Sequence, residues 1–493
     1  MKHSILIITF TLFTFCANAQ KADNITIGKI ETIYSKPLGE NRKLWIYTPD
    51  ITSKIPNPQK KYPVLFVLDG DTHFYSTVGI IQQLSQANGN GILPEMIVVG
   101  VESGNRLKDF TPTLNTRGSL DSANPFVKFL ATELMPYIDE NFNSAPYKLL
   151  VGHSLGGLII MDILSNYSNL FNAYIAIEPS MWYQNEKFLK QNINTLKNQN
   201  FDNTKLFIGV ANTLPEGITL SLLKNDKSIE TQHIRSTFKL DDFLKNTKIP
   251  GLKYAMKYYE DDDHNSVPLI SEYDGLRFIF DFYRLNATKK DFTEASPAIV
   301  AKLKTHYDIV SKEMGYEVSP PEALIKYFGY NALGKKQFAK AEAFFKLNIA
   351  YYPESHKVYG AYGDYYATKK DTANAIKYYK FALSMNNDNI IQNKLNVLTN
   401  QNKFSLTENE LEKYVGIYTI QPYEIDVEFY LQDRSLWSKV KGQKAEELVP
   451  ISPNAFRLRN KKGYTITFKT NDNKIVGFTS VQPNGTFNAV FKN

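Results

Sequence analysis

The stretch Gly152-His153-Ser154-Leu155-Gly156 constrains the fold of this chain more than any other. It follows the apolar run 149–151, which predicts a buried strand, and precedes the apolar segment 158–164, which predicts a helix. A serine between two glycines at a strand-to-helix junction has the pattern of a nucleophile elbow, a tight turn that leaves the hydroxyl exposed. The two glycines would let strand and helix pass close together. Because so short a pattern also arises by chance, the prediction depends on the surrounding segments.

The surrounding segments alternate between apolar strands and helices. Five further apolar runs predict buried strands: residues 62–71, 94–101, 172–177, 205–210 and 252–259. Residues 25–33 and 42–49 alternate polar with apolar side chains and predict antiparallel edge strands, while residues 125–141 predict a helix. We therefore expect an α/β fold with a mostly parallel sheet, helices on both faces and polar site residues at the carboxyl ends of the strands.

A histidine that could activate Ser154 follows the last predicted strand. In this architecture the serine comes first in the chain, an acid follows a later strand and the histidine comes last. His264 has the expected place, at the start of the loop after residues 252–259. We predict that its imidazole accepts the Ser154 proton and so activates the oxygen as a nucleophile.

The acid that orients His264 is expected after the strand 205–210. Glu216 is the next carboxylate there, and we predict that it holds the His264 tautomer and stabilises the imidazolium. Three alternatives stay open: Glu178, which follows the strand 172–177, the acidic run 261–263, and a serine–histidine pair without a dedicated acid.

Backbone and side-chain groups near the elbow predict the rest of the site. The N–H groups of Leu155 and Asp71 are the expected oxyanion donors, because the turn after residues 62–71 should lie beside the elbow. Trp182 is expected to line the substrate pocket; the alternative is that it packs in the core. Arg106 is expected to pair with an anionic substrate group, with an ion pair to Asp109 as its alternative.

Four segments together resemble the putative esterase family of α/β-hydrolases, which includes esterase D and the enterobactin-type siderophore esterases. They are the strand and turn 62–71, the segment 105–112 with an R-x-x-D-x-T-P pattern, the helix and elbow 129–157, and the segment 263–268 around His264. The resemblance covers roughly residues 25–285. It implies an α/β-hydrolase fold and a serine carboxylic-ester hydrolase that works through an acyl-enzyme without a metal or organic cofactor. It further implies a siderophore-type or other aromatic ester as substrate.

The amino terminus predicts export. Lys2, the apolar stretch 5–15 and Ala17-Asn18-Ala19 form the pattern of a signal peptide, so we expect residues 1–19 to be removed and the protein to be periplasmic or secreted. The only cysteine, Cys16, lies in this leader, which excludes disulfides and thiolate metal sites from the mature chain. No later run reaches about 18 apolar residues, so no membrane span is expected. The net charge is +7, but the basic residues form no long run in the sequence, which argues against nucleic-acid binding.

The chain beyond the resemblance predicts two further parts. Three small or aromatic positions recur at a 34-residue offset, which resembles the tetratricopeptide period: Gly329, Ala341 and Phe345 return as Gly363, Ala375 and Tyr379. Residues 297–314 and 390–398 are expected to complete or cap this stack, which could serve as a spacer or bind a protein partner. Short alternating segments from residue 407 predict a small antiparallel β domain that resembles a lipocalin-like barrel.

We therefore predict four regions and one leading function. The regions are a signal peptide (1–19), an α/β-hydrolase domain (20–286), a tetratricopeptide-like helical region (287–403) and a β-barrel (404–493). The leading function is hydrolysis of a carboxylic ester. The alternative is a non-catalytic periplasmic binding protein that recruits a partner through its repeats and β domain. Transfer of the acyl group to an alcohol instead of water stays open.

Overall fold

The computed structural model describes residues 25–49, 60–85, 87, 91–114, 118–399, 404–472 and 474–492. The predicted leader at residues 1–19 lies outside these ranges. The chain divides into two compact units, Met1–Ala287 with Leu303–Ser319, and Thr288–Lys302 with Pro320–Asn493.

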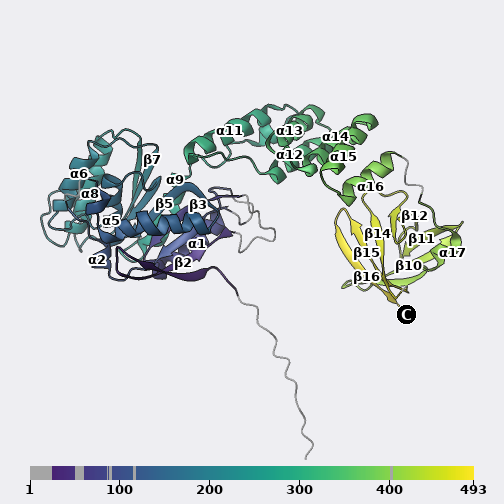
Figure 1. The fold of residues 1–493 in the computed structure, drawn as a ribbon, viewed down its shortest axis with the longest axis horizontal. Coiled ribbons are helices and arrows are strands. Elements are labelled where there is room, and N and C mark those ends of the chain that lie inside the picture. The colour runs from purple at the N-terminus through teal and green to yellow at the C-terminus, as the bar shows by residue number, and fades with distance from the viewer. Residues whose placement is uncertain are drawn as a thin grey trace, which may run out of the picture. The chain divides into compact units, whose positions relative to one another are not determined.

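A sheet of eight strands forms the centre of the first unit (Figure 1). The strands are β1 (Lys29–Ser35), β2 (Glu40–Tyr47), β3 (Tyr62–Leu68), β4 (Ile97–Val101), β5 (Ser144–His153), β6 (Ala173–Ile177), β7 (Thr204–Ala211) and β8 (Leu252–Tyr259). Their order in the sheet is β1-β2-β4-β3-β5-β6-β7-β8. Only β1 with β2 and β2 with β4 pair antiparallel, and the other neighbours are parallel. The expected α/β fold with a mostly parallel sheet is confirmed.

Helices cover both faces of this sheet, which explains why its central strands are apolar throughout. One apolar core contains residues of α5 (Leu155–Asn166), α6 (Lys187–Leu196) and α8 (Gln232–Asn246). The opposite core contains residues of α1 (Gly70–Ser85) and α9 (Val267–Ile279). The remaining helices of this unit are α2 (Arg106–Phe110), η3 (Leu120–Ser122), α3 (Pro125–Phe129), the π turn η4 (Leu130–Leu134), α4 (Met135–Asn141) and α7 (Leu220–Leu223). Within the described ranges, no helix has both the length and the apolar character needed to span a bilayer.

Glu272 on α9 is a fully buried carboxyl group that accepts a hydrogen bond from Thr77 Oγ1 at 2.9 Å. Burial raises its pKa from the usual 4.5 to about 8, although the Thr77 hydrogen bond acts in the opposite direction. The unfolded chain therefore releases this proton above pH 4.5, whereas the folded protein keeps it until about pH 8. Because the unfolded state then binds fewer protons, stability falls as the pH rises between these values.

We expect Glu272→Gln to stabilise the protein at pH 7 by up to about 3 kcal/mol and to have little effect below pH 4.5. Glutamine keeps the shape and can still accept from Thr77, but it cannot ionise. Urea denaturation of both proteins at pH 4.5 and pH 7 measures the effect. Glu216→Gln, in an exposed turn, is the control. A difference between wild type and Glu272→Gln that does not grow with pH would contradict the explanation.

Seven helices lie between α9 and residue 399 of the described chain: α10 (Lys289–Thr293), α11 (Ala298–Met314), α12 (Glu322–Gly334), α13 (Phe338–Tyr351), α14 (His356–Thr368), α15 (Thr372–Met385) and α16 (Asn389–Leu398). The 34-residue offset has a structural counterpart. A Cβ on Gly329 would lie 2.8 Å from the Phe345 ring, and one on Gly363 would lie 2.5 Å from the Tyr379 ring. Each glycine therefore lets an aromatic ring of the next helix in the chain pack directly against its own helix. The tetratricopeptide assignment and binding of a protein partner stay predictions.

The second half of α11 packs in the α/β unit and not in the repeat stack, where the sequence predicted it. Val310 and Met314 are buried in the same apolar core as α1 and α9, and Leu303–Ser319 groups with the α/β unit. Lys205 of β7 also forms an ion pair with Glu313 of α11 at 2.9 Å. Side-chain periodicity predicted this helix but not the surface on which it packs.

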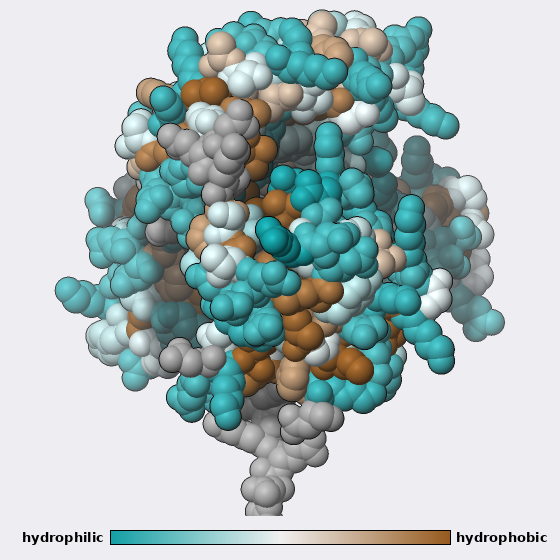
Figure 2. All heavy atoms as spheres, turned by 90° about the vertical axis from the view of Figure 1, so that its right-hand side faces the viewer, coloured by the Kyte–Doolittle hydropathy of each residue, from teal (hydrophilic) through white to brown (hydrophobic). Residues whose placement is uncertain are grey.

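The carboxyl-terminal strands form a closed antiparallel barrel preceded by α17 (Glu408–Glu412), which confirms the predicted β-barrel. The strands are β9 (Gly416–Gln421), β10 (Ile425–Gln432), β11 (Ser435–Val440), β12 (Glu446–Ser452), β13 (Ala455–Leu458), β14 (Thr465–Asn471), β15 (Lys474–Gln482) and β16 (Gly485–Lys492). Buried aromatic rings pack at its centre, with centroids of Tyr418 and Phe429 5.3 Å apart and of Phe429 and Phe468 5.1 Å apart. Its interior is thus a packed core, whereas the side chains of Ile417, Ile425 and Val490 are exposed to solvent. Figure 2 shows hydrophobic side chains among hydrophilic ones on one face of the protein.

Candidate active site

Ser154 occupies a tight turn between β5 and α5. Its backbone has φ 61° and ψ −113°, an unfavourable conformation for a residue with a side chain. Its N–H donates to the Ile177 carbonyl at 2.9 Å, and its own carbonyl accepts from Ser180 N–H at 3.2 Å. A Cβ on Gly152 would lie 2.8 Å from the Gly156 backbone, so the close approach requires glycine. The geometry is that of the predicted strand–turn–helix elbow.

His264 contacts Glu178 rather than Glu216. The His264 Nδ1 atom lies 3.2 Å from Glu178 Oε2. Glu178 directly follows β6, whose last residue Ile177 pairs with His153 just before Ser154. The serine and this carboxylate therefore leave adjacent strands at the same edge of the sheet. Nδ1–H of His264 donates to the carboxylate, which leaves Nε2 free to accept a proton.

The predicted acid Glu216 lies apart from this contact. It occupies an exposed turn five residues beyond the end of β7 and makes no hydrogen bond or ion pair with a described residue. The acidic run 261–263 shapes the His264 loop instead, because Asp263 Oδ1 accepts the N–H groups of Asn265 and Ser266 at 2.8 and 2.9 Å. Of the carboxylates considered from the sequence, Glu178 is the one bonded to His264.

The Glu178 carboxylate is buried and ionised. Its side chain is 0% exposed, and Oε1 accepts the Ala211 N–H at 2.8 Å. Burial alone raises the pKa of Glu178, but the hydrogen bonds from His233 and His264 outweigh it and lower that pKa to about 2. The group therefore carries its negative charge throughout the neutral range, as a carboxylate that stabilises an imidazolium must.

Two further histidines that the sequence did not single out lie at this site. His233, in the first turn of α8, places Nε2 2.9 Å from Glu178 Oε2. His153, within the elbow, has its ring centroid 4.5 Å from that of His264. Burial, followed by the influence of His264, lowers the pKa of His153 to about 3, so it stays neutral beside His264. The position of His153 inside the elbow motif could have identified it from the sequence, whereas nothing near His233 in the chain connects that residue with Ser154.

The predicted oxyanion donors both lie in the first turns of helices. Leu155 begins α5, and Asp71 is the second residue of α1. First-turn N–H groups have no acceptor within their own helix and so can bind a ligand oxygen. The strands that lead to these helices, β3 and β5, are neighbours paired through Val67 and Val151. The donor roles stay predictions.

The two predicted substrate-binding side chains lie in different settings. Arg106 donates to both Asp69 carboxylate oxygens at 3.0 and 3.1 Å and to the His153 carbonyl at 3.1 Å, so its ion pair is with Asp69. The alternative partner Asp109 is buried and paired with Arg42 at 2.7 Å. Trp182 is 42% exposed in the segment after Glu178 and is therefore not a core residue. Their contact with a substrate stays a prediction.

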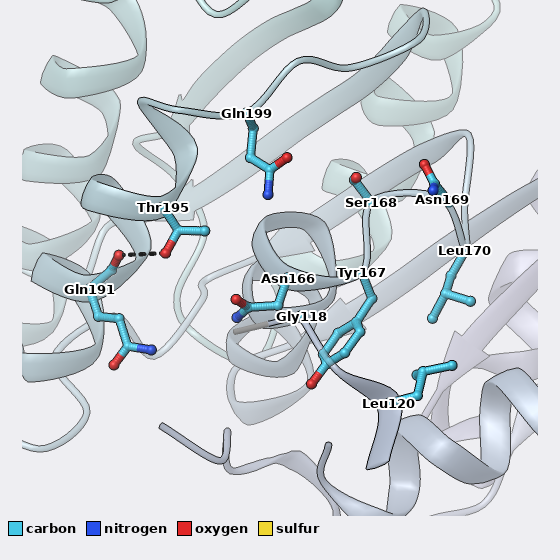
Figure 3. A pocket seen from close by; sticks show the side chains of 10 residues that line it. All are labelled: Gly118, Leu120, Asn166, Tyr167, Ser168, Asn169, Leu170, Gln191, Thr195 and Gln199. Atoms are coloured by element: carbon cyan, nitrogen blue, oxygen red, sulfur yellow. Dashed lines mark hydrogen bonds between the residues drawn. The ribbon is translucent and has the colours of Figure 1, made fainter. Parts of the chain in front are cut away.

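A cavity of about 720 Å³ lies at the opposite end of α5 from Ser154 (Figure 3). Its lining is uncharged and rich in amides and hydroxyls, including Asn166, Gln191, Thr195 and Gln199. α5 has 12 residues, so its two ends are about 18 Å apart. Because this cavity contains neither Ser154 nor a histidine, it is separate from the candidate active site.

The first unit resembles known proteins in sequence. A model of the family described as Putative esterase matches residues 35–233. Ferri-bacillibactin esterase BesA of Bacillus subtilis (strain 168) is 27% identical over 193 residues, which are 35% of this chain and 66% of that protein. Uncharacterized protein YbbA of the same organism is 28% identical over 156 residues, which are 29% of this chain and 59% of that protein. The chain thus spans less than two thirds of either relative.

Solved structures resemble it as well. An IroE-like serine hydrolase from Shewanella oneidensis superposes with a TM-score of 0.52 and 26% identity, covering 66% of this chain and 99% of that chain. An uncharacterised protein from Capnocytophaga ochracea DSM 7271 also has a TM-score of 0.52, at 18% identity, covering 76% of this chain and 99% of that chain. The second likeness concerns the fold alone.

Proposed function

We propose that this chain, whose residues 35–233 match the model of the putative esterase family, is a serine hydrolase that cleaves carboxylic esters. One observation carries the proposal: the elbow serine Ser154 lies next in the chain to His153, whose ring contacts that of His264, and His264 is held by the buried Glu178 carboxylate. Ser154 Oγ makes no hydrogen bond to a described residue. Catalytic contacts of this kind are often loose without substrate and tighten when it binds.

In the proposed reaction His264 Nε2 takes the Ser154 proton while Oγ attacks the ester carbonyl. The carbonyl oxygen becomes an oxyanion, and the N–H groups of Leu155 and Asp71 are its proposed donors. The negative charge of Glu178 stabilises the imidazolium. That imidazolium then gives its proton to the leaving alcohol, which leaves an acyl group on Ser154. Water, activated by His264 in the same way, releases the acid and restores the serine.

The proposed substrate class is a siderophore-type or other aromatic ester. Two similar proteins support it through their names, a ferri-bacillibactin esterase and an IroE-like serine hydrolase. In this chain the exposed Trp182 offers a surface for an aromatic ring, and the Arg106 guanidinium, which is paired with Asp69 but 41% exposed, offers N–H donors to an anionic group. Export through the predicted leader at residues 1–19 would place the enzyme in the periplasm or the medium.

Steady-state kinetics of the full chain test both levels of the proposal. Discrimination between substrates is expressed in the ratio of their kcat/KM values. We expect kcat/KM for a catecholate trilactone such as enterobactin to exceed that for p-nitrophenyl acetate at least about tenfold. A feruloylated oligosaccharide and an acetylated sugar complete the comparison. A trilactone no better than p-nitrophenyl acetate overturns the siderophore assignment, and failure to cleave any of the four esters overturns the esterase assignment.

A further inference from the structure

Three potential metal ligands converge on one point beside the elbow. The atoms are His233 Nε2, His264 Nδ1 and an oxygen of Glu178, and all lie within 4.8 Å of one another. His233 Nε2 is 2.9 Å and His264 Nδ1 is 3.2 Å from the same oxygen, Oε2. The two imidazole planes are inclined at 81°, with ring centroids 5.4 Å apart. A serine–histidine–acid triad requires only one of these histidines.

The donor set matches the chemistry of zinc. Two neutral imidazoles and one carboxylate are a ligand combination that Zn²⁺ accepts, with a fourth position left for water. Glu178 supplies a negative charge, and its Ala211 hydrogen bond holds the other oxygen in place as an outer-shell support. The His233 and His264 side chains are 20% and 35% exposed, which leaves a path for an ion.

Two of the three separations between the ligand atoms are close to those around a coordinated ion. Zinc–nitrogen and zinc–oxygen bonds of about 2.0 to 2.2 Å place neighbouring ligands of a tetrahedron about 3.3 Å apart. The two nitrogen–oxygen distances of 2.9 and 3.2 Å are close to that value, and the two nitrogens, which lie within 4.8 Å of each other, would come to about 3.3 Å apart when the side chains bind the ion. We propose that Glu178, His233 and His264 bind a Zn²⁺ ion and that this ion reversibly inhibits the enzyme.

Inhibition follows from which nitrogen of His264 binds the ion. Coordination uses the Nδ1 lone pair, so the proton of the neutral ring must reside on Nε2. An Nε2 that already carries a proton cannot accept the proton of Ser154, and the oriented carboxylate is occupied by the metal as well. Zinc binding and general-base catalysis therefore exclude each other. This consequence rests on the proposed esterase function, whereas zinc binding itself does not.

Zinc binding is tested without activity, on the full chain freed of metal. Isothermal titration with Zn²⁺ is expected to give one ion per wild-type chain, and Co²⁺ is expected to give the visible spectrum of a tetrahedral site. His233→Gln and His264→Gln should each weaken binding at least about 100-fold, since even the loss of an outer-shell partner costs about 10- to 100-fold. His356→Gln is the matched control, because His356 also faces a carboxylate, Asp388 at 3.3 Å, in the other unit. It should bind zinc as the wild type does.

Inhibition is tested with p-nitrophenyl acetate. Zinc should inhibit wild type and His356→Gln equally, an excess of EDTA should restore the rate, and His233→Gln should require at least about 100-fold more zinc. His233→Gln that binds zinc like the wild type overturns the site, and zinc that binds without inhibiting overturns the mechanism. Metal-free wild type without hydrolytic activity would contradict the proposed function, while the titration still decides whether the site exists.

Discussion

Replacing Ser154 with alanine is expected to lower the kcat/KM for p-nitrophenyl acetate by roughly 10⁵- to 10⁶-fold. The variant lacks the oxygen that attacks the carbonyl, so no acyl-enzyme can form. Its fold should persist, because a smaller side chain is compatible with the same turn. Steady-state rates measured beside a thermal melt separate loss of catalysis from loss of structure.

Ser168→Ala is the control for this experiment, since Ser168 lines the cavity at the far end of α5. It should retain wild-type rates. A fluorophosphonate probe should label the wild type and Ser168→Ala but not Ser154→Ala. Wild-type protein that neither reacts with the probe nor hydrolyses an ester would favour the alternative of a non-catalytic binding protein.

Replacing Glu178 with glutamine is expected to lower kcat about 10⁴-fold, as loss of the orienting carboxylate does in serine proteases. Glutamine has nearly the same shape but carries no charge, so it cannot stabilise the His264 imidazolium. Its amide can also present a donor to Nδ1, which would favour the wrong tautomer. Because the hydrogen bonds of His233 and His264 outweigh burial and lower the pKa of Glu178 to about 2, the deficit relative to wild type should persist at pH 5.

Glu216→Gln provides the matched comparison, because both substitutions replace a glutamate that follows a strand of the parallel sheet. We expect its kcat to stay within about twofold of wild type, since Glu216 is exposed and does not contact His264. The reverse pattern, with a large loss at Glu216 and a small one at Glu178, would restore the assignment made from the sequence. Small losses at both would indicate a serine–histidine pair.

The sequence by itself determined the features that depend on local pattern. Apolar runs and their spacing predicted the parallel sheet, because a strand buried on both faces must be apolar throughout its length. The glycines around Ser154 predicted the elbow, since only glycine permits the 2.8 Å approach at Gly152. His264 was found from chain order after the last strand, and alternation predicted the carboxyl-terminal barrel.

Only the tertiary structure decided which groups meet His264. Glu178 and Glu216 both follow parallel strands, so the sequence offered two comparable acids. Glu178 directly follows β6 and has a backbone φ of 45°. Its carboxylate forms hydrogen bonds with the Ala211 N–H, His233 and His264 at the edge of the sheet. His233 lies 55 residues from Glu178 in the chain. Contacts between such distant segments depend on how helices and loops pack over strand ends, which the periodicity of a single segment does not encode.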